Sequence, residues 1–124
     1  MTTLPNPKPG QLCDRSLPHD VRQGLFGGQG AVRVWALTAR PAQPFTAILA
    51  CELEAGASVG PHVQEHDPEI VIAISGSGTV SVNGVAASFS SGQVIELAHG
   101  HTLAIDNTAS TDPLRYLIVK ARGR

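Results

Sequence analysis

Apolar and polar side chains alternate through most of the chain from Ala31 to Ala121, and this pattern restricts what the chain can fold into. Successive side chains of a β-strand point to opposite faces, so a period of two is typical of half-buried strands. Asn83-Gly84 is the strongest hairpin signal, because both residues tolerate positive φ. Many short strands separated by glycine and proline turns predict an all-β barrel or sandwich. The strands are expected at residues 31–38, 45–53, 69–75, 79–82, 85–89, 93–98, 101–107 and 114–121.

The length of 124 residues is that of one domain with a real core. Residues 1–30 contain four prolines and five glycines, which predicts an extended N-terminal arm with turns. Within it, residues 17–26 are a short patch that could form a helical turn or cover an apolar surface. The barrel is expected over residues 31–121, followed by a tail at residues 122–124.

Composition excludes several classes of partner. A net charge of −1 offers no basic patch for nucleic acid and no polybasic membrane surface. The uncharged span of residues 70–95 is interrupted by serines and four glycines, so it lacks the roughly 20 apolar residues that a bilayer requires. The N-terminus lacks the basic start and apolar stretch of a signal peptide, which predicts a cytoplasmic protein. Cys13 and Cys51 have no metal-type spacing and are expected to be free thiols.

A cluster of polar residues lies between Gly56 and Gly76. His62, Gln64 and His66 alternate, so a strand would place two imidazoles and one amide on a single face. Asp67-Pro68 breaks this run, and Glu69 therefore begins a new segment beside the imidazoles. Imidazole and carboxylate are ligands that borderline divalent metals prefer. The cluster thus predicts either a metal site or a solvated hairpin end.

The spacing of these residues resembles the motifs of the cupin superfamily, the small double-stranded β-helix or jelly-roll barrels. The first cupin motif is a glycine, five residues, His-x-His, three or four residues, a glutamate, six residues and a glycine. Here Gly56, His62, Glu69 and Gly76 match, and Gln64 replaces the second histidine. The second motif keeps its first glycine and its asparagine as Gly92 and Asn107. Its proline and its histidine are replaced, by Ala98 and Leu103.

The resemblance implies a metal site with an incomplete ligand set. His62 and Glu69 are retained, Gln64 is a poor substitute, and Leu103 cannot bind a metal. His101, two residues before Leu103 and about 7 Å away along a strand, or His66 from the turn, could complete two histidines and one carboxylate. Such a set suits Fe(II), or Zn, Mn or Ni with open positions. The alternative is a metal-free hydrogen-bonded network of imidazole, carboxylate and amide.

The same strand faces predict a cavity for a small-molecule ligand. If His62 and Glu69 point inward, apolar side chains line the same space, a form usual for small-ligand sites. No arginine or lysine lies on this predicted inner face, which counts against a strongly anionic substrate. Asn107 is expected to bond turn backbone. The predicted lining residues are Val71, Ala73, Leu103 and Ile105.

The resulting hypothesis is a small cupin that binds a small organic ligand in its barrel. As an enzyme it would perform metal-dependent oxygenation, isomerisation or lyase chemistry, or use His62 and Glu69 as a metal-free acid–base pair. The alternative is a non-catalytic ligand-binding or sensor module, and the fold alone does not choose between them. A homodimer is expected as well, because residues 69–75 are apolar on both faces and the outer face needs to be covered. A second subunit would lie near Ile70, Ile72 or Ile74.

Overall fold

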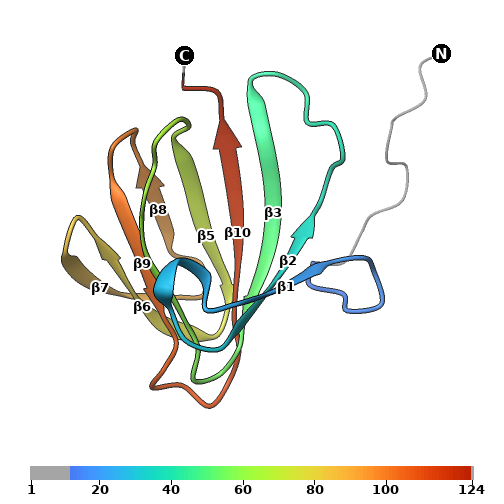
Figure 1. Cartoon of the computed structure of the whole chain (residues 1–124). Helices are drawn as coiled ribbons and strands as arrows, with labels where there is room; N and C mark the ends of the chain where they lie inside the picture. The colour runs from blue at the N-terminus through green and yellow to red at the C-terminus, as the bar shows by residue number, and fades with distance from the viewer. Residues whose placement is uncertain (1–11, 124) are drawn as a thin grey trace.

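The computed structural model describes residues 12–123, which form two antiparallel sheets that face each other in a barrel (Figure 1). The six-stranded sheet has the order β1-β2-β3-β10-β5-β8, and the four-stranded sheet has the order β4-β9-β6-β7. Strands that are distant in sequence therefore lie side by side, as in a jelly roll. The predicted all-β, double-stranded β-helix fold is confirmed. The strands are β1 Asp20–Gln23, β2 Ala31–Ala36, β3 Phe45–Leu53, β4 Ser58–Val63, β5 Glu69–Ser75, β6 Ser77–Val82, β7 Val85–Ser90, β8 Val94–Leu97, β9 Thr102–Asp106 and β10 Leu114–Ala121.

Strand boundaries follow the alternation of side chains closely. β3, β5 and β10 begin and end where the pattern predicts, and β7 follows the turn at Asn83-Gly84. In β5, burial alternates at the start of the strand: Glu69, Val71 and Ala73 are buried, whereas Ile70 is exposed. The core fills the space between the two sheets because each contributes one apolar face.

The N-terminal segment differs from the expected extended arm. Residues 20–23 form β1, which pairs antiparallel with β2 at the sheet edge, and Leu25–Gly27 forms a short 3₁₀ turn, η1. All four residues of β1 are exposed, so the strand leaves no apolar alternation in the sequence by which it could be recognised. Leu25 packs against the core, which agrees with the prediction that residues 17–26 could cover an apolar surface. The prolines at positions 5, 7 and 9 lie outside the described residues.

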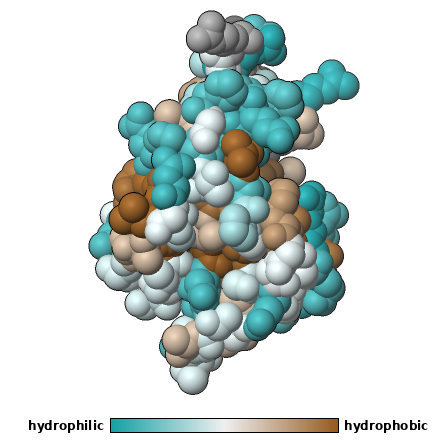
Figure 2. All heavy atoms as spheres, turned by 60° about the vertical axis from the view of Figure 1, so that its left-hand side comes forward, coloured by the Kyte–Doolittle hydropathy of each residue, from teal (hydrophilic) through white to brown (hydrophobic). Residues whose placement is uncertain are grey.

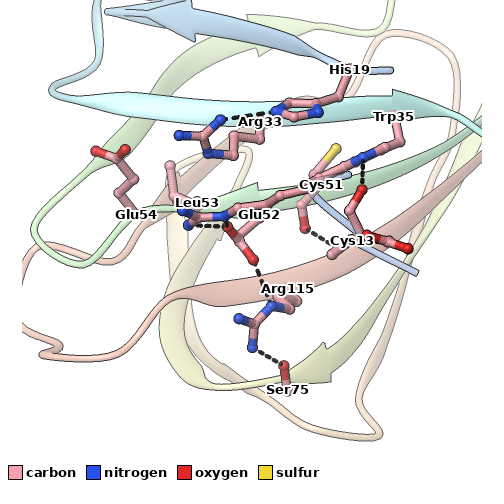
Figure 3. Close-up of polar contacts among 12 residues, drawn as sticks. Cys13, His19, Arg33, Trp35, Cys51, Glu52, Leu53, Glu54, Ser75 and Arg115 are labelled. Carbon is pink, nitrogen blue, oxygen red and sulfur yellow. Dashed lines mark hydrogen bonds and ion pairs between the residues drawn. The ribbon is translucent and has the colours of Figure 1, made fainter. Parts of the chain in front are cut away.

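The outer face of the six-stranded sheet is partly covered by the segment before β1 (Figure 3). The Trp35 indole N–H donates to the Asp14 carbonyl at 2.8 Å, and the indole packs against the His19 ring with centroids 4.6 Å apart. Beside it, Glu52 on β3 accepts from Nε of Arg15 at 2.9 Å and from Nε of Arg115 at 2.7 Å. This ion-paired cluster fastens the N-terminal segment to β3 and β10.

Asn107, the residue shared with the second cupin motif, ties loops together. Its side-chain amide lies within hydrogen-bonding distance of three carbonyl oxygens, at Leu53, Glu54 and Asp112. The residue is 1% exposed, and its side chain joins the end of β3 to the loop before β10. The expected role of Asn107 in bonding turn backbone agrees with these contacts.

No helix within residues 12–123 has the length and apolar character to cross a membrane. On the side of the molecule formed by β6 to β9, apolar surface is divided into separate patches by polar atoms (Figure 2). Val85 on β7 and Val94 on β8 are exposed. Val85 is an ordinary exposed residue of a protein surface, whereas Val94 is the cross-strand partner of Ile72 and lies beside the outer face of β5.

Candidate ligand-binding site

A cavity of about 250 Å³ opens between the two sheets, beside η1 and β1. Its walls are mostly apolar and come from β2, β3, β4, β9 and β10. Among the described residues, four charged ones line it: Glu69 from β5, Lys120 from β10, and Asp20 and Arg22 from β1. A mainly apolar cavity with a few convergent polar groups is the usual form of a small-ligand site.

Glu69 is the central polar group of this cavity. It opens β5 directly after the Asp67-Pro68 turn and is 3% exposed. The Gln64 amide donates to Oε1 of Glu69 at 3.3 Å, and Nζ of Lys120 lies 3.6 Å from Oε2. Lys120 and Glu69 are direct cross-strand partners on β10 and β5, which explains their proximity. Oε2 of Glu69 nevertheless has no hydrogen-bond partner among the described residues.

His62 lies at the cavity mouth on β4. Its ring stacks on Phe26 of η1, with centroids 4.3 Å apart and an interplanar angle of 14°. Its Nδ1 lies 3.4 Å from the Gly60 carbonyl, a contact that favours a proton on Nδ1 and leaves Nε2 as the acceptor. Gly60 is required here because any Cβ at this position would overlap the Phe26 carbonyl oxygen. η1 therefore sits directly on β4 and positions the ring of His62.

The proposed ligands His62, Gln64, Glu69, His66 and His101 do not gather into one site. β4 ends at Val63, so the alternation does not continue to His66, which is exposed in the following bend. Nδ1 of His101 accepts from the backbone N–H of Ala98 at 3.0 Å within a turn before β9. Over residues 12–123, no group of three or more His, Cys, Asp or Glu side chains is arranged to hold a metal ion.

The predicted cavity lining is partly corrected. Leu103 and Ile105 line the cavity, but Val71 and Ala73 are buried in the packed core beyond it. The expectation of an inner face without basic residues was wrong, since Lys120 and Arg22 both reach the cavity. The strand prediction for residues 114–121 already contained the signal for Lys120, because it shares a face with Tyr116 and Ile118.

Tyr116 and Cys51 form the floor of the cavity as cross-strand partners on β10 and β3. Both are almost fully buried. Burial, reinforced by the neighbouring Cys13 thiol, raises the pKa of Cys51 to about 12. Burial, with the Cys51 thiol beside the phenol, raises the pKa of Tyr116 well above its ordinary range. Both groups are therefore neutral at physiological pH, and the floor of the cavity carries no charge.

A comparison with models of protein families shows which family the chain belongs to. The family model described as "Cupin domain" matches residues 49–120, more than half of the chain. The chain belongs to the cupin family. The matched span contains β4, β5, β9 and all of β10 except Ala121, and thus most of the polar groups of this cupin's cavity. No curated protein matches the chain.

Solved structures agree on the fold. A predicted oxalate decarboxylase from Thermotoga maritima superposes with a TM-score of 0.81 at 24% identity, covering 91% of this cupin and 99% of that chain. A Cupin 2 conserved barrel domain protein from Salinispora arenicola has a TM-score of 0.70 at 23% identity, with coverages of 94% and 90%. A putative sugar phosphate isomerase from Acidithiobacillus ferrooxidans has a TM-score of 0.65 at 20% identity, with coverages of 74% and 60%. At these identities the likeness extends to the fold alone.

Cupins often bind divalent metals, but the residues of this cavity do not fit one. Leu103 lies directly opposite His62 in the β4–β9 register and fills the position of the fourth family ligand with an alkyl group. Oε1 of Glu69 accepts from the Gln64 amide, and Oε2 lies 3.6 Å from the Lys120 ammonium, in an ion pair but without a hydrogen bond. A divalent cation at Glu69 would have to displace or neutralise that ammonium group.

Proposed function

We propose that this cupin binds a small, mainly apolar organic molecule in the cavity beside Glu69, without a metal ion. The observation that carries the proposal is the buried carboxylate oxygen of Glu69, which lines an apolar cavity and has no hydrogen-bond partner in the described part of the chain. A buried polar atom without a partner is costly, and a bound ligand or an ordered water would satisfy it. Two similar structures are described as a predicted oxalate decarboxylase and a putative sugar phosphate isomerase; these descriptions support a small ligand but not its apolar character, because oxalate and sugar phosphates are anions.

The test is a ligand screen performed with and without chelator. Small apolar compounds are expected to raise the melting temperature of the chain equally in the presence and absence of EDTA. Val34→Phe and Ala36→Phe each fill part of the cavity and should abolish the response. Val94→Phe places the same ring on the exposed surface of β8 and serves as the matched control. Stabilisation that requires added metal, or that survives both cavity-filling variants, would refute the proposal.

A second candidate is metal-free acid–base catalysis by His62 and Glu69, which line the same cavity. The contact of His62 Nδ1 with the Gly60 carbonyl leaves Nε2 as the basic nitrogen. A general base also has to lie within hydrogen-bonding reach of the proton that it removes. Compounds found in the screen should then be converted slowly by the native chain and not by His62→Gln, even though that variant still binds them. Binding without turnover in both proteins would leave the chain a binding module.

A further inference from the structure

We infer that the ligand of this cavity is an uncharged molecule of about one ring, apolar over most of its surface, that presents a hydroxyl group to Glu69 and Lys120. This inference deepens the proposed function and rests on it. It follows from three properties of the cavity: its size, its balance of charge, and the arrangement of donors and acceptors at its polar end.

The volume sets the size of the ligand. The cavity measures about 250 Å³. An apolar cavity of about 150 Å³ in another protein accommodates benzene. The present cavity therefore has room for a six-membered ring with one or two small substituents, and it is too small for a nucleotide or a disaccharide.

The charges around the cavity favour a neutral ligand. Asp20 and Glu69 contribute two negative charges, and Arg22 and Lys120 contribute two positive charges. Arg22 pairs with Asp20 at 3.6 Å, and Lys120 pairs with Glu69 at the same separation. A carboxylate ligand would meet the buried charge of Glu69, and an ammonium ligand would meet Lys120. The net charge around the cavity thus gives neither ion an advantage.

The polar end requires a group that both donates and accepts. Oε1 of Glu69 already accepts from Gln64, whereas Oε2 has no hydrogen-bond partner within residues 12–123. Nζ of Lys120 stands 3.6 Å from Oε2, which is longer than the 2.7–3.2 Å of a good N–H···O hydrogen bond. A hydroxyl group placed beside both would donate to Oε2 and accept from Nζ. An ether or a hydrocarbon would leave Oε2 without a donor.

The experiment compares probes that share one ring. Phenol, anisole, toluene and benzoate are titrated by protein-observed NMR against the full chain. Phenol is expected to bind at least about tenfold more tightly than anisole, because a hydrogen bond to a charged acceptor is worth that factor or more. Benzoate is expected to bind more weakly than phenol.

Substitutions assign this preference to its residues. Glu69→Gln should reduce the preference for phenol over anisole to about twofold or less, because it removes the charged acceptor. Lys120→Met removes a donor that the oxygen of either probe could use, so it should weaken the binding of both. Glu96→Gln, an exposed carboxylate on the adjacent strand β8, should preserve the preference. If Glu69→Gln does not fold, Lys120→Met decides, because unchanged affinity for phenol in that variant would overturn the placement of the hydroxyl beside Nζ.

The outcomes separate the inference from the proposed function. Equal affinities for phenol, anisole and toluene, all lost in Val34→Phe, would overturn the hydroxyl preference and leave the cavity a ligand site. Tighter binding of benzoate would likewise overturn the inference, because it would assign the cavity to anions. Resonance shifts that do not involve the cavity residues, for any probe, would refute the proposed function itself.

Discussion

His62 and Leu103 lie directly opposite each other on β4 and β9, so the imidazole that would begin a metal site faces an alkyl side chain. This arrangement indicates which substitutions would restore a metal site. The double substitution of Gln64→His with Leu103→His supplies the two missing imidazoles next to His62 and Glu69. We expect this variant to retain close to one Ni(II) or Zn(II) per chain after dialysis, measured by elemental analysis, and the native chain to retain far less.

The neighbouring ammonium group allows a further comparison. Adding Lys120→Met to the double variant removes the cation that lies 3.6 Å from Glu69, and it should tighten metal binding. Arg40→Met, which removes an exposed cation instead, should leave metal binding unchanged. A stoichiometric metal in the native chain that disappears in His62→Ala would contradict the prediction.

Glu52 makes the stability of the fold depend on pH. Burial by itself raises the pKa of this carboxyl, but the hydrogen bonds and charges of Arg15 and Arg115 outweigh burial and hold the pKa below its ordinary value. The stabilisation is therefore present above the ordinary glutamate pKa of about 4.3 and is lost as the pH falls through the lowered pKa of the folded state. Glu52→Gln should cost about 1–3 kcal/mol in free energy of unfolding at pH 7.

Urea unfolding at several pH values measures this dependence. The difference between the native chain and Glu52→Gln should shrink as the pH decreases below about 4.3, because the protonated carboxyl comes to resemble the amide. Glu65→Gln, at an exposed position, should change the free energy of unfolding by less than about 0.5 kcal/mol throughout. A constant difference across the acidic range would refute the assignment.

The two cysteines should be unreactive in the folded protein. Both are free thiols. Burial, together with the charge of Glu52, raises the pKa of Cys13 to about 11, and burial raises that of Cys51 to about 12. Because the thiolate is the reactive form, a disulfide reagent at pH 8 should label neither thiol rapidly and should label both after denaturation. Rapid labelling that disappears in Cys13→Ser would show that the N-terminal segment opens.

Gly60 determines whether η1 can close over the cavity. A Cβ at this position would overlap the carbonyl oxygen of Phe26, and the flanking residues Val59 and His62 are paired with β9. Gly60→Ala should therefore displace η1, increase hydrogen exchange over residues 24–28 and weaken the binding of cavity ligands. Pro61→Ala, at the next and exposed residue, is the control and should leave both unchanged. Unaltered exchange in Gly60→Ala would show that η1 does not depend on this contact.

We also propose that two copies associate through the outer face of β5 and its neighbours. Ile70 is 40% exposed, and Ile72 and Ile74 are partly exposed on the same face. Their cross-strand partners include Val119 and Leu117 on β10, which extends the apolar surface. Sedimentation at micromolar concentration should show a dimer for the native chain and a monomer for Ile70→Lys. A native monomer would refute this proposal.

The fold was largely predictable because its information is local. The alternation in residues 45–53, 69–75 and 114–121 predicts which side chains are buried, and Asn83-Gly84 indicates where a hairpin turns. The motif spacing around His62 and Glu69 also identified two residues that line the cavity. β1 could not be recognised because an edge strand with four exposed side chains has no hydrophobic period.

Only the tertiary structure decided what surrounds Glu69. Alternation places Lys120 on an inward face, but it does not state that β10 lies beside β5 in the register that pairs these two residues. Likewise, no local pattern indicates that Phe26 stacks on His62 or that Leu103 stands opposite it. The sequence by itself thus determined the strands, the turns and the cupin spacing. Packing between segments far apart in the chain determined the partners of Glu69, and with them whether the cavity suits a metal ion or an organic ligand.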